Sequence, residues 1–202
     1  TVLTVRTSPS LSGAMIDALP YLLDYPYGCT EQTLARFVPA VLTRKALQTA
    51  GGVKLEDLSA ARTNLNAQHL TADGKVDKDR LAREAKLYAR NPIYNTKVLD
   101  EIISTGLMRV RKMQHGDGGW GWWTDDESSV YMTALVLNAL LDARDADLPI
   151  DENMIQRGRQ ALQSLVAAEL WRWRQYKDWV HDGDAFAALV MARFGDKNDE
   201  MQ

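Results

Sequence analysis

Residues 25–33, Tyr25-Pro26-Tyr27-Gly28-Cys29-Thr30-Glu31-Gln32-Thr33, separate two helical patterns and contain the only cysteine of the chain. Upstream, over 11–22, apolar residues recur at helical spacing, which predicts a helix. Pro26 ends that helix, because a residue before proline avoids the α region. Gly28 supplies a permissive turn, and a second helix is predicted to begin near Thr30. The stretch therefore joins two helices through a tight turn.

Helical periodicity extends over most of the remaining chain. The second helix is expected to end at Gly51-Gly52. Further helices are predicted at about 55–69, 77–90, 96–115, 127–144, 151–168 and 183–194. Only residues 1–7 alternate as a strand does, and Ser8-Pro9-Ser10 ends the pattern. Because the connections are short, the helices are expected to pack as antiparallel hairpins of an all-α fold, in a bundle, a solenoid or a closed toroid.

The composition is that of an ordinary globular protein. Of 202 residues, 46% are apolar and 25% are charged, so the chain can bury a sizeable core in one domain. A net charge of −3 without a Lys/Arg cluster argues against nucleic-acid binding. No apolar run reaches the ~18 residues that span a bilayer, and no Cys/His cluster has the spacing of a metal site. We therefore expect no cofactor, no nucleic acid and no membrane contact by this chain.

The cysteine lies three positions before a glutamine. Residues three apart in a helical turn are neighbours, so the sulfur of Cys29 and the side-chain carbonyl of Gln32 can meet. If the sulfur attacks this carbonyl, ammonia leaves and an internal thioester forms, which is more electrophilic than an amide or an ester. Such a bond hydrolyses in water and must be kept dry. A lone cysteine is usually a small buried hydrophobe, and it is the surrounding residues that favour the thioester here.

Four neighbours of this pair are candidate supporting residues. Gly28 permits the turn. Glu31 is expected in the first turn of the following helix, where a carboxylate stabilises the helix dipole, and a role in the reaction is the alternative. Tyr25 and Tyr27 flank the pair. They either form a lid that excludes water and small amines, or they pack in the core with their hydroxyls hydrogen-bonded.

Residues 25–33 resemble the thioester motif of the α2-macroglobulin and complement family, in the form found in bacterial α2-macroglobulins. Cys-x-x-Gln alone is a weak signal, but here it follows Tyr-Pro-Tyr-Gly and opens a helix in an all-α chain. Residues 114–122, Gln-His-Gly-Asp-Gly-Gly-Trp-Gly-Trp, and 130–137, Val-Tyr-Met-Thr-Ala-Leu-Val-Leu, are similar to the Gln-Asp-Gly turn and Leu-Thr-Ala helix of the family. We expect the glycines to allow a tight turn between helices. Trp120 and Trp122 are expected to plug the end of the toroid.

The resemblance implies a fold, a domain organisation and a function. Thioester domains of this family are α/α toroids, and the helices predicted here fill only part of one. Residues 1–8 would be a strand of a neighbouring CUB-like domain, and residues 9–202 the thioester domain of a longer protein. The thioester would trap attacking proteases covalently after cleavage of a bait region elsewhere in that protein, as a single-turnover inhibitor and not an enzyme. The implied partners are target proteases and other domains of the same parent chain. The implied location is the periplasm or the outside of the cell, where the parent protein could be a membrane-anchored lipoprotein.

The resemblance also bears on which nucleophile opens the bond. In some members of the family a histidine attacks first, forms an acyl-imidazole and shifts the preference from amines to hydroxyls. The chain has His69, His115 and His181. His181 is the candidate acyl-transfer residue, because it lies late in the chain where the family's histidine is expected. An ordinary surface or core histidine is the alternative, and the preferred adduct would then be with lysine amines.

Two other classes of function remain open. Residues 114–122 also resemble the QW turn of terpene cyclases, which share the α/α toroid. Asp125-Asp126-Glu127 matches their acidic or metal-binding centre poorly and fits surface acids better. In the second alternative the domain is a structural or binding module in which the thioester never forms. The presence of both Cys29 and Gln32 argues against it.

Overall fold

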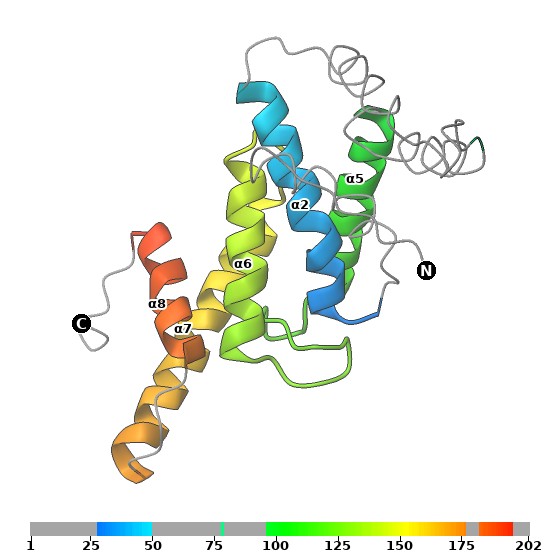
Figure 1. Cartoon of the computed structure of the whole chain (residues 1–202). Helices are drawn as coiled ribbons and strands as arrows, with labels where there is room; N and C mark the ends of the chain where they lie inside the picture. Colours follow the sequence, from blue (N-terminus) through cyan, green and yellow to red (C-terminus); the bar gives the residue numbers. More distant parts are fainter. Residues whose placement is uncertain (1–27, 50–77, 79–95, 177–181, 196–202) are drawn as a thin grey trace, which may run out of the picture.

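The computed structural model describes residues 28–49, 78, 96–176 and 182–195, and in these residues every regular element is a helix. Figure 1 shows the helices, which are α2 (Thr30–Thr49), α5 (Thr96–Lys112), α6 (Val130–Arg144), α7 (Glu152–Tyr176) and α8 (Asp182–Arg193). The prediction of an all-α fold is confirmed for this part of the chain. The predicted strand and domain boundary at 1–8 and the helices predicted at 11–22, 55–69 and 77–90 fall outside the described residues, apart from Lys78.

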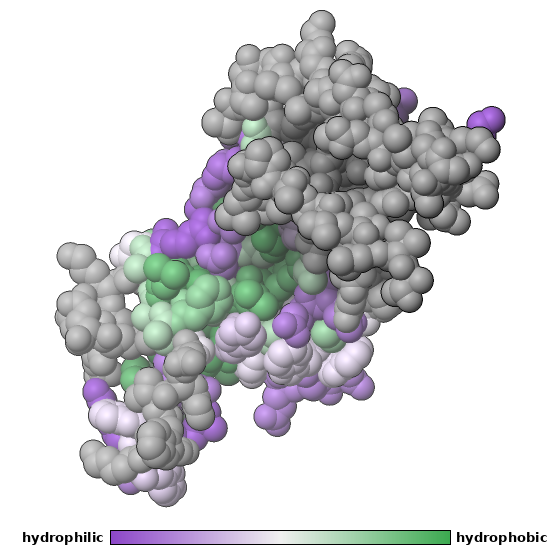
Figure 2. All heavy atoms as spheres, viewed as in Figure 1, coloured by the Kyte–Doolittle hydropathy of each residue, from purple (hydrophilic) through white to green (hydrophobic). Residues whose placement is uncertain are grey.

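Helix α6 forms the centre of the described core. It packs against α2, α7 and α8, while α2 also packs against α5. Because α6 has neighbours on several sides, its side chains are buried nearly all round, as expected for a core helix. Figure 2 shows hydrophobic residues gathered over the middle of the described helices, with hydrophilic residues around them. None of the described helices is both long and apolar enough to cross a bilayer.

The contact between α2 and α5 depends on one small residue. Phe37 of α2 is fully buried and packs over Gly106 of α5, where an added Cβ would lie only 2.8 Å from a ring carbon of Phe37. Glycine at this position therefore lets the two helices approach closely.

The loop between α5 and α6 is fixed by the core at its middle. Trp120 is completely buried, and its indole Nε1–H donates to the carbonyl of Val110 over 2.9 Å. A Cβ on Gly158 of α7 would lie 2.5 Å from the Trp120 ring, so α7 packs directly on it. The predicted role as a plug fits Trp120 but is wrong for Trp122, which is 42% exposed.

Three helix boundaries differ from the sequence prediction by three residues or more. Helix α5 ends at Lys112 and not near 115. Helix α6 begins at Val130 and not near 127, because the side chain of Ser129 accepts a hydrogen bond from the backbone N–H of Met132 and caps the helix. Helix α7 continues to Tyr176, well beyond 168. Its last residues are exposed, so no apolar stripe marks them in the sequence.

Candidate functional site

Cys29 occupies the N-cap position of α2. Its carbonyl accepts hydrogen bonds from the backbone N–H of Thr33 (3.1 Å) and from the Thr33 hydroxyl (3.0 Å). The first of these is the first intrahelical bond, so the helix begins at the residue after Cys29. The cysteine is free and buried, with 8% of its surface exposed. The N-terminus of α2 thus holds the thiol-bearing residue in a defined and largely dry position.

The side chain of Gln32 turns back toward Cys29. Its carbonyl oxygen Oε1 accepts a hydrogen bond from the backbone N–H of Cys29 over 3.2 Å. This is the contact that a glutamine at the third helical position makes in a capping box. A Cβ on Gly28 would collide with the same oxygen, so glycine leaves the room that the Gln32 carboxamide occupies. The structure therefore brings Gly28, Cys29 and Gln32 together at one helix terminus.

A buried threonine ties this helix terminus to the loop between α5 and α6. The Thr30 hydroxyl donates to the carbonyl of Gly121 over 2.7 Å, and its backbone N–H donates to the carbonyl of Trp122 over 2.9 Å. Thr30 and Thr33 are both completely buried, and each hydroxyl lies within 4 Å of the Met113 sulfur. Sequence reasoning missed both threonines. Nothing local in the sequence identifies their contacts with Met113 and the loop, because those partners lie more than 70 residues away.

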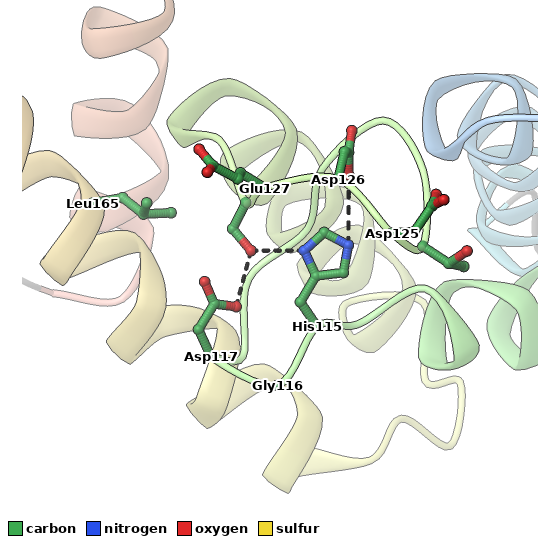
Figure 3. A pocket seen from close by; sticks show the side chains of 9 residues that line it. His115, Gly116, Asp117, Asp125, Asp126, Glu127 and Leu165 are labelled. Carbon is green, nitrogen blue, oxygen red and sulfur yellow. Dashed lines mark hydrogen bonds and ion pairs between the residues drawn. The ribbon is translucent and has the colours of Figure 1, made fainter.

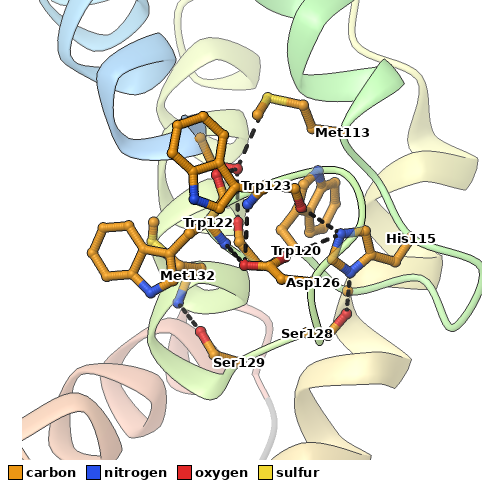
Figure 4. A network of polar contacts seen from close by, with 12 residues as sticks. Met113, His115, Trp120, Trp122, Trp123, Asp126, Ser128, Ser129 and Met132 are labelled. Carbon is orange, nitrogen blue, oxygen red and sulfur yellow. Dashed lines mark hydrogen bonds and ion pairs between the residues drawn. The ribbon is translucent and has the colours of Figure 1, made fainter. Parts of the chain in front are cut away.

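The loop that receives Thr30 is held by an acidic side chain and a histidine. The Asp126 carboxylate accepts from the backbone N–H groups of Trp122 (2.8 Å) and Trp123 (3.1 Å). His115 places Nε2 at 2.8 Å from the Trp123 carbonyl and Nδ1 at 2.9 Å from the Ser128 hydroxyl (Figure 4). Because both ring nitrogens have partners in the loop, His115 is a structural part of this turn, and sequence reasoning did not assign it that role.

The same loop borders a shallow depression of about 450 Å³ beside α7 (Figure 3). It is lined by His115, Gly116, Asp117, Thr124, Asp125, Asp126, Glu127, Ser128 and Leu165. Of the three consecutive acids, Asp126 is committed to the Trp122 and Trp123 peptide groups. Among the described residues, no group of three or more histidine, cysteine or acidic side chains is arranged to hold a metal ion. The acidic segment thus organises a turn.

The other predicted site residues have different outcomes. Glu31 lies in the first turn of α2 and is exposed, where its carboxylate faces the positive end of the helix dipole. Tyr25, Tyr27 and His181 fall outside the described residues, so the lid and the acyl-transfer histidine stay predictions.

Comparison with known proteins agrees with the resemblance in the sequence. A family model for the A-macroglobulin TED domain matches residues 81–167. The α2-macroglobulin of Thermotoga maritima is 30% identical over 164 residues, which are 81% of this chain and 8% of the relative. The α2-macroglobulin of Escherichia coli is 25% identical over 174 residues, 84% of this chain and 8% of the relative. The thioester-containing protein 1 of Anopheles gambiae is 26% identical over 164 residues, 81% of this chain and 9% of the relative.

The fold is also that of a solved structure. The cryo-EM reconstruction of native Escherichia coli α2-macroglobulin aligns with a TM-score of 0.52 at 22% identity, over 90% of this chain and 9% of that chain. The chain thus spans less than a tenth of the length of these relatives. The matched family model, the sequence relatives and the shared helical fold lead to one assignment: the chain belongs to the α2-macroglobulin and complement thioester family, and it is similar to the thioester domain of the bacterial members.

Proposed function

We propose that Cys29 and Gln32 form an internal thioester through which this domain covalently captures attacking proteases. The observation that carries the proposal is the hydrogen bond that holds the Gln32 carboxamide 3.2 Å from the backbone of Cys29, beside a buried thiol. Such positioning replaces a bimolecular encounter with an intramolecular one.

The chemistry balances without a cofactor. The Cys29 sulfur attacks the side-chain carbonyl carbon of Gln32, a carbon–sulfur bond forms, the carbon–nitrogen bond breaks, and the nitrogen leaves as ammonia. A lysine amine of a protease then attacks the same carbon. The carbon–sulfur bond breaks, an amide joins the protease to the side chain at position 32, and the amine proton goes to the sulfur of Cys29. Each domain reacts once and is not regenerated, so it acts as a single-turnover covalent inhibitor.

The trigger and the surroundings of this reaction belong to a longer protein. Since the chain spans about 8% of its α2-macroglobulin relatives, we place the protease-sensitive bait region and further shielding domains outside it, in a periplasmic or extracellular parent. We propose amines as the preferred nucleophiles, because the described histidine, His115, has both ring nitrogens engaged. His181 stays the candidate for transfer to hydroxyls.

Mass spectrometry of freshly purified protein tests the thioester. The expected mass is lower than that of the sequence by one ammonia, and methylamine should add to the protein and expose one thiol. Cys29→Ala and Gln32→Ala should show neither change. The fragment spectrum of the peptide spanning position 32 separates the failures. A glutamate there means that a thioester formed and hydrolysed, whereas an unmodified Gln32 with a free thiol that refuses methylamine overturns the proposal.

A further inference from the structure

The loop between α5 and α6 contacts the thioester segment and leaves Trp122 and Trp123 exposed. Through Gly121 and Trp122 it accepts both hydrogen bonds of Thr30, the residue next to Cys29. The Trp123 ring lies 3.8 Å from the position of a Cβ on Gly28. The backbone and one indole of residues 121–123 therefore lie against Gly28 and Thr30, the two neighbours of Cys29. Trp123 is itself 53% exposed, so packing in the core does not hold it there.

Polar contacts hold the Trp122–Trp123 dipeptide in place. One oxygen of the Asp126 carboxylate takes the N–H groups of both tryptophans, while the other lies 3.6 Å from His115 Nε2. His115 Nε2 in turn lies 2.8 Å from the carbonyl of Trp123. Figure 4 shows the His115 ring beside Asp126, with Trp122 and Trp123 on the other side of that carboxylate. His115 and Asp126 thus engage all the peptide groups of Trp123 and the N–H of Trp122.

The proton on one ring nitrogen of His115 follows from its partners. A peptide carbonyl only accepts hydrogen bonds, so Nε2 carries the proton and donates to Trp123. Nδ1 faces Ser128, whose hydroxyl also lies 2.9 Å from the Asp117 carboxylate. The Nδ1–H tautomer would leave two acceptors facing each other at Nε2, so the contact with Trp123 itself selects a ring that carries the Nε2 proton.

The histidine is itself well anchored. Its side chain is 11% exposed, its backbone N–H donates to Gly119 over 2.9 Å, and its carbonyl accepts from Arg157 of α7 over 3.0 Å. A partly buried donor on a fixed backbone can hold a loop that has little packing of its own.

We propose that His115 is a positioning residue for the Cys29–Gln32 site. Its Nε2–H fixes the Trp123 carbonyl, the Trp122–Trp123 dipeptide then stays on Thr30, and the N-terminus of α2 stays closed over the thiol and the acyl carbon. His115 would thus set how long the reactive bond survives before a protease triggers it. This inference rests on the proposed function, although the closure of the loop over Cys29 can be measured without a thioester.

Two substitutions of His115 test whether the hydrogen-bond donor at Nε2, and not the imidazole ring as such, positions the loop. In His115→Gln the amide nitrogen stands as many bonds from Cα as Nε2 does, so it can still donate to Trp123. In His115→Asn the nitrogen corresponds to Nδ1 and cannot reach that carbonyl. Asp125→Asn is the matched control, because Asp125 lines the same depression but does not accept from the Trp122 or Trp123 N–H groups.

The first readout is alkylation of the Cys29 thiol by iodoacetamide in the full 202-residue chain, after treatment with methylamine to open any thioester. A buried thiol reacts through local opening. Loss of one hydrogen bond that closes the loop should raise the rate about three- to tenfold in His115→Asn. His115→Gln and Asp125→Asn should stay within about twofold of the parent. The second readout is the rate at which fresh protein loses its thioester in buffer, for which the same order is expected.

The outcomes are distinct. Faster alkylation in His115→Asn alone supports the proposal. Equal rates in all proteins, or equal acceleration in His115→Gln and His115→Asn, overturn it, and so does equal acceleration in Asp125→Asn. If His115→Asn does not fold, Asp126→Ala carries the same prediction, and an unchanged alkylation rate in that variant overturns the proposal. If fresh protein contains no thioester, the proposed function fails while the alkylation rates still decide the role of His115.

Discussion

The carbonyl oxygen of Gln32 and the backbone N–H of Cys29 are joined by a hydrogen bond of 3.2 Å. This contact caps the helix and also presents the carboxamide to the residue that carries the thiol. Helix capping and the proposed thioester formation therefore require the same position of the Gln32 side chain. Stability and reactivity can still be separated by substitutions that move only the carboxamide.

Gly28→Ala should impair thioester formation without unfolding the domain. The added Cβ would collide with Gln32 Oε1, the end of a flexible side chain that can swing away at little cost in stability. Misplacement of a reacting group by about 1 Å can slow a reaction roughly 100-fold. We expect the fraction of protein that has lost ammonia, measured by mass spectrometry, to fall by roughly 10- to 100-fold.

Gly116→Ala is the control for this variant, because nothing lies within 4 Å of a Cβ at that turn. Equal thioester content in Gly28→Ala and the parent would contradict the assigned role of Gly28.

Thr30→Val should destabilise the chain more than Thr30→Ser does. Valine keeps the shape of threonine but leaves the buried Gly121 carbonyl without the donor that now lies 2.7 Å away. An unsatisfied buried acceptor costs about 1–3 kcal/mol, whereas serine keeps the hydroxyl and loses only a methyl group. The free energy of unfolding in urea should show this order. A valine variant as stable as the serine variant would mean that the hydroxyl contributes little.

Most of the described helices could be predicted, because apolar residues recur at helical spacing between segments that contain glycine or proline. The end of α7 could not be, since its residues from Glu169 onward are largely exposed and are kept helical by residues of good intrinsic propensity. Glycine at 158 lowers the helix propensity of α7, and the structure shows why it is there: a Cβ would lie 2.5 Å from the Trp120 ring.

The candidate site also could be predicted from the sequence only in part. Cys29 and Gln32 are recognised from the surrounding residues 25–33, together with a spacing of three that one helical turn makes meaningful. The hydrogen bond between His115 and the Trp123 carbonyl lies in an irregular loop, which has no periodic sequence pattern. The contacts of Thr30 join α2 to that same loop. Such relationships become visible only when the chain is folded.

Trp120→Phe should lower the free energy of unfolding strongly, in contrast with the same change at Trp171. Trp120 is fully buried, and its Nε1–H satisfies the Val110 carbonyl. Phenylalanine leaves both a cavity and an unpaired acceptor, for a loss of about 2–4 kcal/mol. Trp171 is 58% exposed, so Trp171→Phe should stay within about 0.5 kcal/mol of the parent. Equilibrium unfolding followed by circular dichroism measures both. Similar losses would contradict the assignment of Trp120 to the core.

Glu31→Gln should distinguish the two roles considered for this carboxylate. Glu31 is exposed in the first turn of α2, and favourable interaction with the helix dipole is worth about 0.3–1 kcal/mol at low salt. We therefore expect a small loss of stability that shrinks at high ionic strength, because salt screens exposed charges. The rate of methylamine addition should stay within about twofold of the parent. Glu101→Gln, an exposed change in the middle of α5, is the control and should show no comparable salt dependence. A methylamine rate that falls tenfold or more in Glu31→Gln alone would instead assign Glu31 to the reaction, because loss of a dipole contact has no reason to change the chemistry at position 32.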